Sequence, residues 1–169
     1  MIEIKEVKEK GLKAEVADKI LHALPDWFGI ISDKQKYVEE SSKLPCFAVF
    51  DNGVPIGFLA VKAHNEIHAE LFLMGVLEQY HRTSIGRGLF NTFQNYCIKQ
   101  GFRYISVKTV DYSSDNEYYV KTRKFYRAMG FVPFEMLRAL WSERNPCLLM
   151  IKDLEDADNS YKCRSSNNE

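Results

Sequence analysis

Glycine and arginine residues stand close together between residues 82 and 88, where a strand pattern gives way to a helix pattern. Gly86 and Gly88 let a ligand approach the backbone closely, and Arg82 and Arg87 add positive charge. The unpaired N–H groups of a first helical turn, together with the helix dipole, bind anions. This segment therefore predicts a cradle for a diphosphate, although the spacing is neither a Walker loop nor a G-x-G-x-x-G fingerprint. By themselves, two glycines near a helix start more often mark only a tight turn.

Tyr126 is a second residue whose type and place suit chemistry. It lies in a helical pattern that ends at Gly130-Phe131, four residues further on. If this end of the helix borders a cleft, the phenol can donate a proton to a leaving group. The alternative is a tyrosine that packs with its hydroxyl at the rim of the core.

Glu70 is the candidate general base. It falls in a strand pattern whose alternation puts His68, Phe72, Met74 and Val76 on the same side. A carboxyl group among apolar side chains has its pKa raised by desolvation, which suits a base. Two alternatives stay open: Glu70 faces solvent on the sheet, or His68, two residues earlier, is the base.

The composition is that of one globular domain whose net charge favours no charged partner. The chain has 169 residues, and 46% of them are hydrophobic, enough for a substantial core and too many for a largely disordered chain. The 23 Lys and Arg residues balance the 23 Asp and Glu residues, so the formal net charge is +0. We therefore expect binding neither to nucleic acid nor to an anionic membrane surface.

Targeting segments and metal sites are not indicated. No apolar run approaches the roughly 18 residues that a membrane-spanning helix needs. Residues 1–6 mix charged with apolar side chains, which is not typical of a signal peptide. The cysteines Cys46, Cys97, Cys147 and Cys163 are far apart and form no C-x-x-C pair. We expect reduced thiols in a cytoplasmic protein, some packed as small hydrophobic residues, and no metal site.

Hydrophobic periodicity and turn signals predict the elements that position these residues. Strands are expected at residues 2–7, 46–50, 55–61, 67–76, 102–110, 131–140 and 147–154, and helices at 12–24, 34–44, 85–100 and 118–129. The order β-α-α-β-β-β-α-β-α-β-β predicts a mixed α/β fold, a central and mostly antiparallel sheet of about seven strands flanked by about four helices. Residues 1–154 are expected to form a single domain, and the polar segment 155–169 a disordered tail.

Two stretches together resemble the signatures of the GNAT superfamily of acetyl-CoA-dependent N-acetyltransferases. The first is His81-Arg82-Thr83-Ser84-Ile85-Gly86, where the family has Gln/Arg-x-x-Gly-x-Gly/Ala at the start of its central helix. The second is Phe125-Tyr126-Arg127-Ala128-Met129-Gly130-Phe131, where the family has an aromatic-Tyr-x-x-x-Gly-Phe helix end. The element order is also the family's, so the resemblance covers residues 2–154. The chain departs from the pattern at His81 and at Ser84, whose small side chain can still donate to a phosphate oxygen.

The resemblance implies a place for acetyl-CoA. The strand 71–76 would splay away from the strand 104–110, and the thioester substrate would wedge between them. Backbone groups of Met74 and Val76 would pair with the pantetheine amides like an added strand, and an N–H near Met74 would polarise the thioester carbonyl. The diphosphate would rest on the N–H groups of residues 82–88. The residues implied in cofactor binding are Met74, Gly75, Val76, His81, Arg82, Thr83, Ser84, Ile85, Gly86, Arg87, Gly88, Thr122 and Phe125.

The implied reaction is direct attack of an amine on the thioester. Glu70 matches the strand position at which some relatives place a general base, and Tyr126 would protonate the departing thiolate. Trp27 and Phe28 lie in the turn between the first two helices, where relatives often line the acceptor site. Anchoring of this turn on the core is the equal alternative. The expected acceptor is a small amine, such as a polyamine, an amino sugar or an amino acid derivative.

Two other functions stay open. A protein N-terminus or a lysine side chain could be the acceptor. Alternatively, the domain could be a non-catalytic acyl-CoA sensor, which would keep the phosphate cradle and dispense with Glu70 and Tyr126. Family members often form dimers through sheet or helix contacts, and the last two strands could support a homodimer here. The implied reaction needs no metal.

Overall fold

The computed structural model describes residues 1–28 and 31–155. The elements follow one another as β1 (Ile2–Val7), α1 (Lys10–His22), α2 (Ile31–Ser41), β2 (Cys46–Asp51), β3 (Val54–Ala63), β4 (His68–Val76), the short 3-10 helix η1 (Glu78–Tyr80), α3 (Ile85–Lys99), β5 (Tyr104–Val110), α4 (Glu117–Ala128), β6 (Val132–Ser142) and β7 (Asn145–Asp153). The predicted order of helices and strands is confirmed, with small differences at element ends. The tail that the sequence predicts to be disordered lies, from residue 156 on, outside the described residues.

Seven strands form one sheet in the order β1-β2-β3-β4-β5-β7-β6. Every neighbouring pair is antiparallel except β4 and β5, which are parallel. Because parallel strands need a crossover connection, the chain passes through α3 between them. The mixed, mostly antiparallel sheet with four flanking helices is therefore confirmed.

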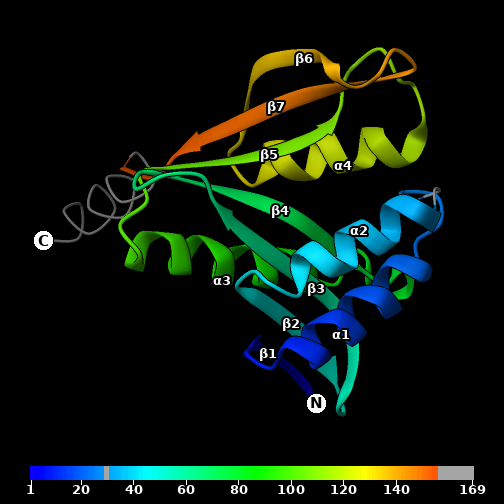
Figure 1. Ribbon diagram of the computed structural model, residues 1–169, viewed down its shortest axis with the longest axis vertical. Helices are drawn as coiled ribbons and strands as arrows, with labels where there is room; N and C mark the ends of the chain where they lie inside the picture. The colour runs from blue at the N-terminus through cyan, green and yellow to red at the C-terminus, as the bar shows by residue number, and fades with distance from the viewer. Residues whose placement is uncertain (29–30, 156–169) are drawn as a thin grey trace, which may run out of the picture.

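The strands β4 and β5 separate along their length. They are paired only from His68 opposite Tyr104 to Leu71 opposite Val107, although β4 continues to Val76 and β5 to Val110. Figure 1 shows the two strands diverging beyond the paired part. We call this opening the fork; it confirms the predicted splay and leaves one edge of the second half of β4 without a strand neighbour.

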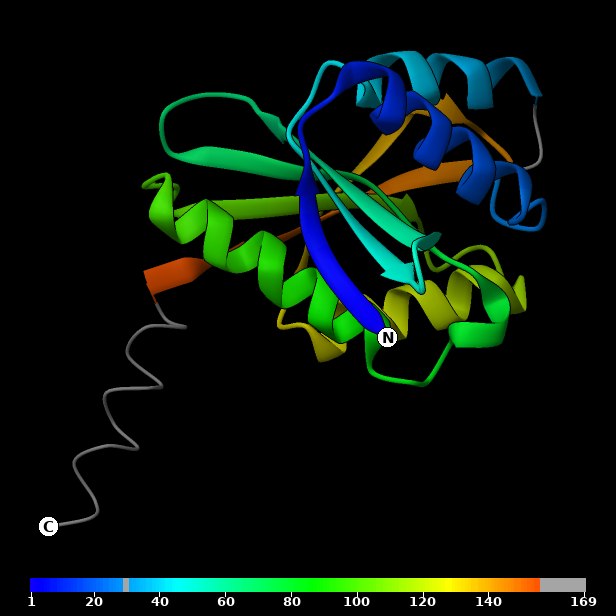
Figure 2. The ribbon, with the colours of Figure 1, turned by 90° about the horizontal axis from the view of Figure 1, so that it is seen from below.

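Helices cover both faces of the sheet (Figure 2). The helices α1 and α2 lie on one face, and α3 and α4 lie on the other. The core on the first face includes Ile20 of α1. The core on the second face contains an apolar stripe of α3, formed by Ile85, Leu89, Phe93 and Cys97, all of them buried. Burial of each large apolar side chain contributes about 1.5–3 kcal/mol, so the sheet is held from both sides.

A bulge in β4 changes which of its side chains share a face. The pairing of β4 with β3 shifts at Phe72, so that Phe72 and Leu73 both pack in the core on the α1 side. Met74 and Val76 pack in the core on the α3 side. The prediction that Glu70 shares a face with Met74 and Val76 is therefore wrong, because one extra residue in a strand reverses the alternation beyond it.

Three of the four cysteines lie in the described residues. Cys46, Cys97 and Cys147 are free and buried, and burial raises the pKa of the Cys46 and Cys97 thiols to about 12. The prediction that some cysteines pack as small hydrophobic residues is confirmed for these three. Cys163 lies outside the described residues.

Within residues 1–28 and 31–155, every helix is too short or too polar to cross a membrane.

Candidate active site

The loop between β4 and α3 has the backbone of an anion site. Arg82 has a φ of 60° and Ser84 a φ of 69°, both in the left-handed region, and α3 begins immediately afterwards at Ile85. No side chain of the described residues caps this helix start. The N–H groups of the first turn are therefore free to bind an oxyanion, aided by the helix dipole. We call residues 82–88 the phosphate loop.

The two glycines of the phosphate loop differ in how tightly they are packed. A Cβ atom on Gly88 would lie 3.1 Å from Ile4 Cδ1, and one on Gly86 would lie 3.4 Å from Phe125 Cε2 and 3.7 Å from Met74 Cε. Gly88 thus lets β1 lie against α3. At Gly86 a Cβ atom would make only ordinary contacts, so the packing does not require glycine there. Gly86 of α3 lies beside Met74 of β4 and Phe125 of α4, and all three are predicted to contact the cofactor.

Gly75 is a different case among the predicted cofactor residues. A Cβ atom there would lie 2.7 Å from Ile20 Cγ2 and 3.1 Å from Leu24 Cδ1. Only glycine fits at this position, because a Cβ atom would collide with the core beneath α1, on the face of the sheet opposite Met74. Only the backbone of Gly75 is left to contact a ligand in the fork.

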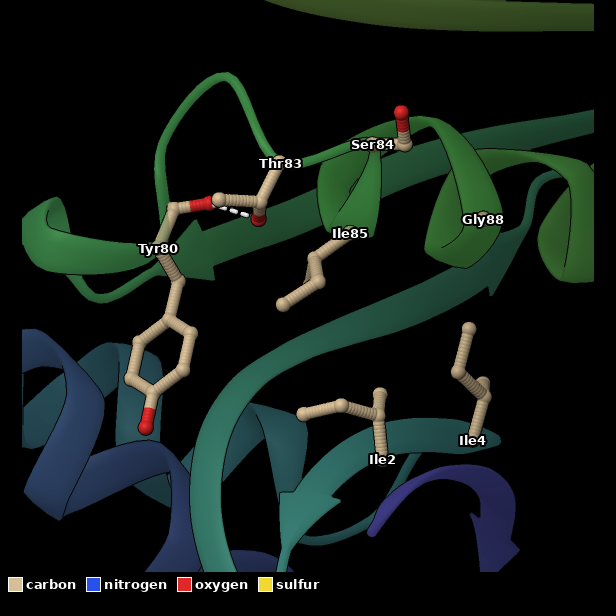
Figure 3. A pocket seen from close by; sticks show the side chains of 7 residues that line it. All are labelled: Ile2, Ile4, Tyr80, Thr83, Ser84, Ile85 and Gly88. Carbon is tan, nitrogen blue, oxygen red and sulfur yellow. Dashed lines mark hydrogen bonds between the residues drawn. The ribbon is translucent and has the colours of Figure 1, made fainter.

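A shallow hollow of about 500 Å³ lies beside the start of α3. In Figure 3, Ile2, Ile4 and Ile85 point into it, and the Ser84 hydroxyl points away. Its lining residues are Ile2, Ile4, Tyr80, Thr83, Ser84, Ile85 and Gly88. The apolar walls suit an apolar group next to the phosphate loop.

His81 connects the phosphate loop to the end of β4. Its Nε2 lies 2.7 Å from the carbonyl oxygen of Val76, one of the two residues predicted to pair with the pantetheine amides. A carbonyl oxygen has two lone pairs, so a second donor can still bind there. The histidine that stands in place of the family's Gln or Arg thus has a structural partner.

Glu70 lies where β4 and β5 are still paired, next to the fork, and only 3% of its surface is exposed. Both of its carboxylate oxygens accept hydrogen bonds from Lys108 Nζ at 2.8 Å. Its Oε2 also lies 2.5 Å from His64 Nε2. The prediction of apolar surroundings for Glu70 is therefore wrong, because β5 and the β3–β4 hairpin supply it with polar partners. A buried charge needs this kind of compensation to be tolerated.

His68, the alternative base, lies beside this group. Its Nε2 is 2.7 Å from Ser106 Oγ, and its ring stacks on that of His64 with centroids 4.9 Å apart. Burial, and then the charge of His64, lowers the pKa of His68, so its imidazole stays neutral over a wider pH range. We call Glu70, His64, Lys108, His68 and Ser106 the fork cluster.

Three members of the fork cluster were not among the predicted site residues. Ser106 and Lys108 occupy alternate positions of a strand that is otherwise mostly apolar. A lysine in such a strand needs a partner, and this signal could have pointed to Glu70. His64 lies in a hairpin, and nothing in the local sequence marks it.

Tyr126 is buried in α4. Its ring packs edge to face on Phe125 and Phe131, with centroids 5.7 and 5.8 Å away. None of the described residues forms a hydrogen bond with its hydroxyl. Burial raises the pKa of Tyr126 well above that of a free phenol, so the hydroxyl keeps its proton at neutral pH. It is therefore available to donate to a ligand.

The turn after α1 is anchored to α4. Trp27 Nε1 donates to Thr122 Oγ1 at 3.3 Å, and its ring meets Tyr118 and His81 edge to face at 4.6 and 5.6 Å. The ring of Phe28 lies 6.5 Å from that of Tyr37. Trp27 is predicted to line the acceptor site, whereas its partners Thr122 and His81 are predicted to bind the cofactor. These contacts place the two predicted sites next to each other.

No group of three or more His, Cys, Asp or Glu side chains in the described part of the chain is arranged to hold a metal ion.

Comparisons with known proteins agree with this arrangement. The profile described as the acetyltransferase (GNAT) family matches residues 15–131, and a search of curated protein sequences gave no match. Among solved structures, the chain is similar to the ribosomal-protein-S18-alanine N-acetyltransferase of Escherichia coli, with 15% identity and a TM-score of 0.71 over 91% of this chain and 94% of that one. It is also similar to the aminoglycoside 6'-N-acetyltransferase of Enterococcus faecium, with 20% identity and a TM-score of 0.69 over 90% and 97%.

A third similar structure is an aminoglycoside 6'-N-acetyltransferase complexed with coenzyme A, with 17% identity and a TM-score of 0.70 over 90% of this chain and 97% of that one. At these identities the structures share the fold. The family profile covers more than half of the chain, and so the chain belongs to the GNAT family of acetyltransferases.

Proposed function

We propose that the protein transfers an acetyl group from acetyl-CoA to the primary amine of a small molecule. The observation that carries this proposal is the fork, which opens beside an uncapped helix start. The free edge of β4 would pair with the pantetheine arm, and the phosphate loop would bind the diphosphate. Met74, Gly86 and Phe125, which lie together beside this edge, would contact the arm.

Glu70 is the proposed base. An alkylamine is mostly protonated near pH 7, and only the neutral form attacks a thioester. Glu70 lies just before the point at which β4 and β5 separate, and its carboxylate would take the proton directly or through one water molecule. Its polar partners would hold it in place for this step.

Tyr126 is the proposed acid. As the C–N bond forms and the C–S bond breaks, negative charge develops on the sulfur of coenzyme A. The buried, protonated hydroxyl of Tyr126 is available to donate to that atom. An N–H of β4 near Met74 would stabilise the carbonyl oxygen in the same step.

The anchored turn after α1 supports a small acceptor. The contacts of Trp27 with Thr122 and His81 tie the turn after α1 to α4 and to the loop before α3, whereas a polypeptide acceptor needs an open channel. Acetylation of a protein N-terminus or lysine is the second candidate, because one similar structure is a ribosomal-protein acetyltransferase. The three buried, free cysteines support the cytoplasm as the place of action.

Isothermal titration of acetyl-CoA into the full-length protein, compared with coenzyme A and ATP, tests the donor. We expect micromolar binding of acetyl-CoA and much weaker binding of ATP. Thiol release with spermidine, glucosamine, phenylalaninamide and a short peptide with a free N-terminus then tests the acceptor. No binding of either coenzyme A species contradicts the proposal, and turnover of the peptide alone assigns the second candidate.

A further inference from the structure

The fork cluster forms a continuous path from the fork toward solvent. Lys108 is the first residue of β5 beyond the last pair that β5 makes with β4. The side chain of Glu70 is 4% exposed, while that of His64, bonded to it, is 34% exposed. His64 lies in the hairpin between β3 and β4, at the end of the molecule away from the open part of the fork (Figure 1).

The proposed reaction releases one proton for each acetyl group transferred. A charged amine loses two protons on its way to a neutral amide, and the leaving thiolate takes up one. The second proton must reach solvent before the next turnover. If Glu70 is the base, it holds this proton at a nearly inaccessible position and needs a neighbour that can accept it.

We propose that His64 is that neighbour: it takes the proton from Glu70 at Nε2 and releases it to solvent. This proposal rests on the proposed function, in which Glu70 is the base. The Nε2–Oε2 distance of 2.5 Å permits direct transfer. The nitrogen that accepts must carry no hydrogen, so the accepting form of His64 is the Nδ1–H tautomer. The O–H bond at Glu70 breaks as an N–H bond forms at Nε2, the imidazolium then loses its Nδ1 proton to water, and exchange with solvent restores the Nδ1–H tautomer.

The other neighbours of Glu70 are less suited to this step. The Lys108 ammonium has three donors and no acceptor, so it cannot take a proton from Glu70. The Nε2 of His68 is engaged by Ser106, and no hydrogen bond joins His68 to Glu70 among the described residues. A neutral imidazole has one nitrogen that accepts a proton and one N–H that can give up its proton, so His64 has the groups that both steps need.

The charged groups around His64 come from several elements. Among the described residues, the titratable groups around the pair of Glu70 and His64 include His68 of β4, Lys62 of β3, Lys108 of β5, Tyr37 and Glu40 of α2, and Cys147 of β7. Lys62 is paired with Glu40, and Lys108 is paired with Glu70. These pairs leave the bond between Glu70 and His64 as the route out of the cluster.

Two substitutions separate proton transfer from positioning. His64→Ala removes the acceptor, whereas His64→Gln keeps an amide N–H that can donate to Glu70 but cannot carry a proton. We expect both to lower kcat at least about tenfold, since general acid–base catalysis typically contributes about 10²–10⁴-fold. The affinity for acetyl-CoA in calorimetry should stay unchanged. His22→Ala, on the exposed surface of α1, is the matched control and should keep full activity.

Added imidazole gives the decisive readout. With acetyl-CoA and the acceptors spermidine, glucosamine and phenylalaninamide, we expect imidazole to restore turnover of His64→Ala and to leave wild type and His22→Ala unchanged. Wild-type rates in either His64 variant, or no rescue of a slow His64→Ala, overturn the role of His64 and leave the acetyltransferase proposal intact. No turnover by wild type with any acceptor defeats the proposed function and this proposal together.

Discussion

Tyr126 owes its suitability as an acid to burial, and the same burial limits how far the proton moves. Its raised pKa lies above that of an ordinary thiol, near 8.5, so full transfer to the thiolate runs uphill. The hydroxyl therefore acts first as a strong hydrogen-bond donor to the departing sulfur, and the proton that the thiolate takes up completes its transfer as coenzyme A leaves.

Tyr126→Phe tests this donor. We expect turnover to fall at least about tenfold while the acetyl-CoA affinity, measured by calorimetry, stays nearly unchanged. The fold should also stay intact, because no described residue loses a hydrogen bond. Tyr112→Phe, at an exposed position, is the control. Unchanged turnover of Tyr126→Phe would remove Tyr126 from the reaction.

His68 makes stability depend on pH. Its pKa is lowered in the folded chain, whereas in the unfolded chain it returns to about 6.5. Below that value the unfolded chain binds more protons than the folded one, so the free energy of unfolding falls as the pH falls. Urea unfolding at a series of pH values between about 7.5 and 5 should show a weaker pH dependence in His68→Gln. An identical dependence in the two proteins would mean that other groups cause it.

The fork cluster shows what the sequence alone could not supply. Glu70 and His68 were recognisable as titratable groups on one strand. Their partners Lys108 and Ser106 lie 38 residues away in the chain, and only the parallel pairing of β4 with β5 brings them together. The chemical surroundings of a side chain depend on such distant contacts, so its expected apolar environment was wrong.

At the scale of elements, the start of α3 depends on a conformation that serine adopts at a cost. Ser84 has a φ of 69°, where a Cβ atom costs about 1–2 kcal/mol. Glycine, which the family pattern has at this position, removes that cost.

We therefore expect Ser84→Gly to raise the free energy of unfolding by up to about 1 kcal/mol and to keep acetyl-CoA binding. Ser84→Val should lower both stability and affinity, because a β-branched residue is strained further there. Thr83→Gly is the control, since Thr83 is not among the residues of positive φ and glycine should not stabilise it. Chemical denaturation and calorimetry provide the two measurements. Destabilisation by Ser84→Gly would contradict this account.

The elements themselves follow closely from local sequence. Alternating apolar residues and the Asp51-Asn52-Gly53 turn predict the meander of β2, β3 and β4, and the stripe from Ile85 to Cys97 predicts α3. The bulge at Phe72 has no such signal, because Phe72 and its neighbours are apolar on both sides. The simple alternation therefore groups His68 with Glu70 correctly, before the bulge. After the bulge it places Met74 and Val76 on the wrong face.

At the scale of the whole molecule, β6 is an unprotected edge. It is the last strand of the sheet, and nearly all of its residues are exposed. Phe134 is 64% exposed, Val132 56% and Leu140 50%. A long apolar edge strand is prone to pair with another chain, and the zero net charge does not oppose association of two copies.

We expect wild type to sediment as a homodimer at micromolar concentration and Phe134→Glu to sediment as a monomer. Ile98→Glu, which places the same charge at an exposed apolar position of α3, should not change the sedimentation. A monomeric wild type would contradict the assignment of this edge to a second copy.

The fork also divides the chain in a way that engineering could use. Residues up to the turn at Gly101 build β1 to β4 with α1 to α3, and the remainder builds β5 to β7 with α4. Within the sheet, the two parts are joined by the short paired stretch of β4 and β5 and by the ion pair between Glu70 and Lys108. Both parts also contribute side chains to the core under α3. Two fragments cut at this turn would share that core, and a molecule lying in the fork would touch both. Their reassembly would then report the concentration of that molecule, as a split sensor does.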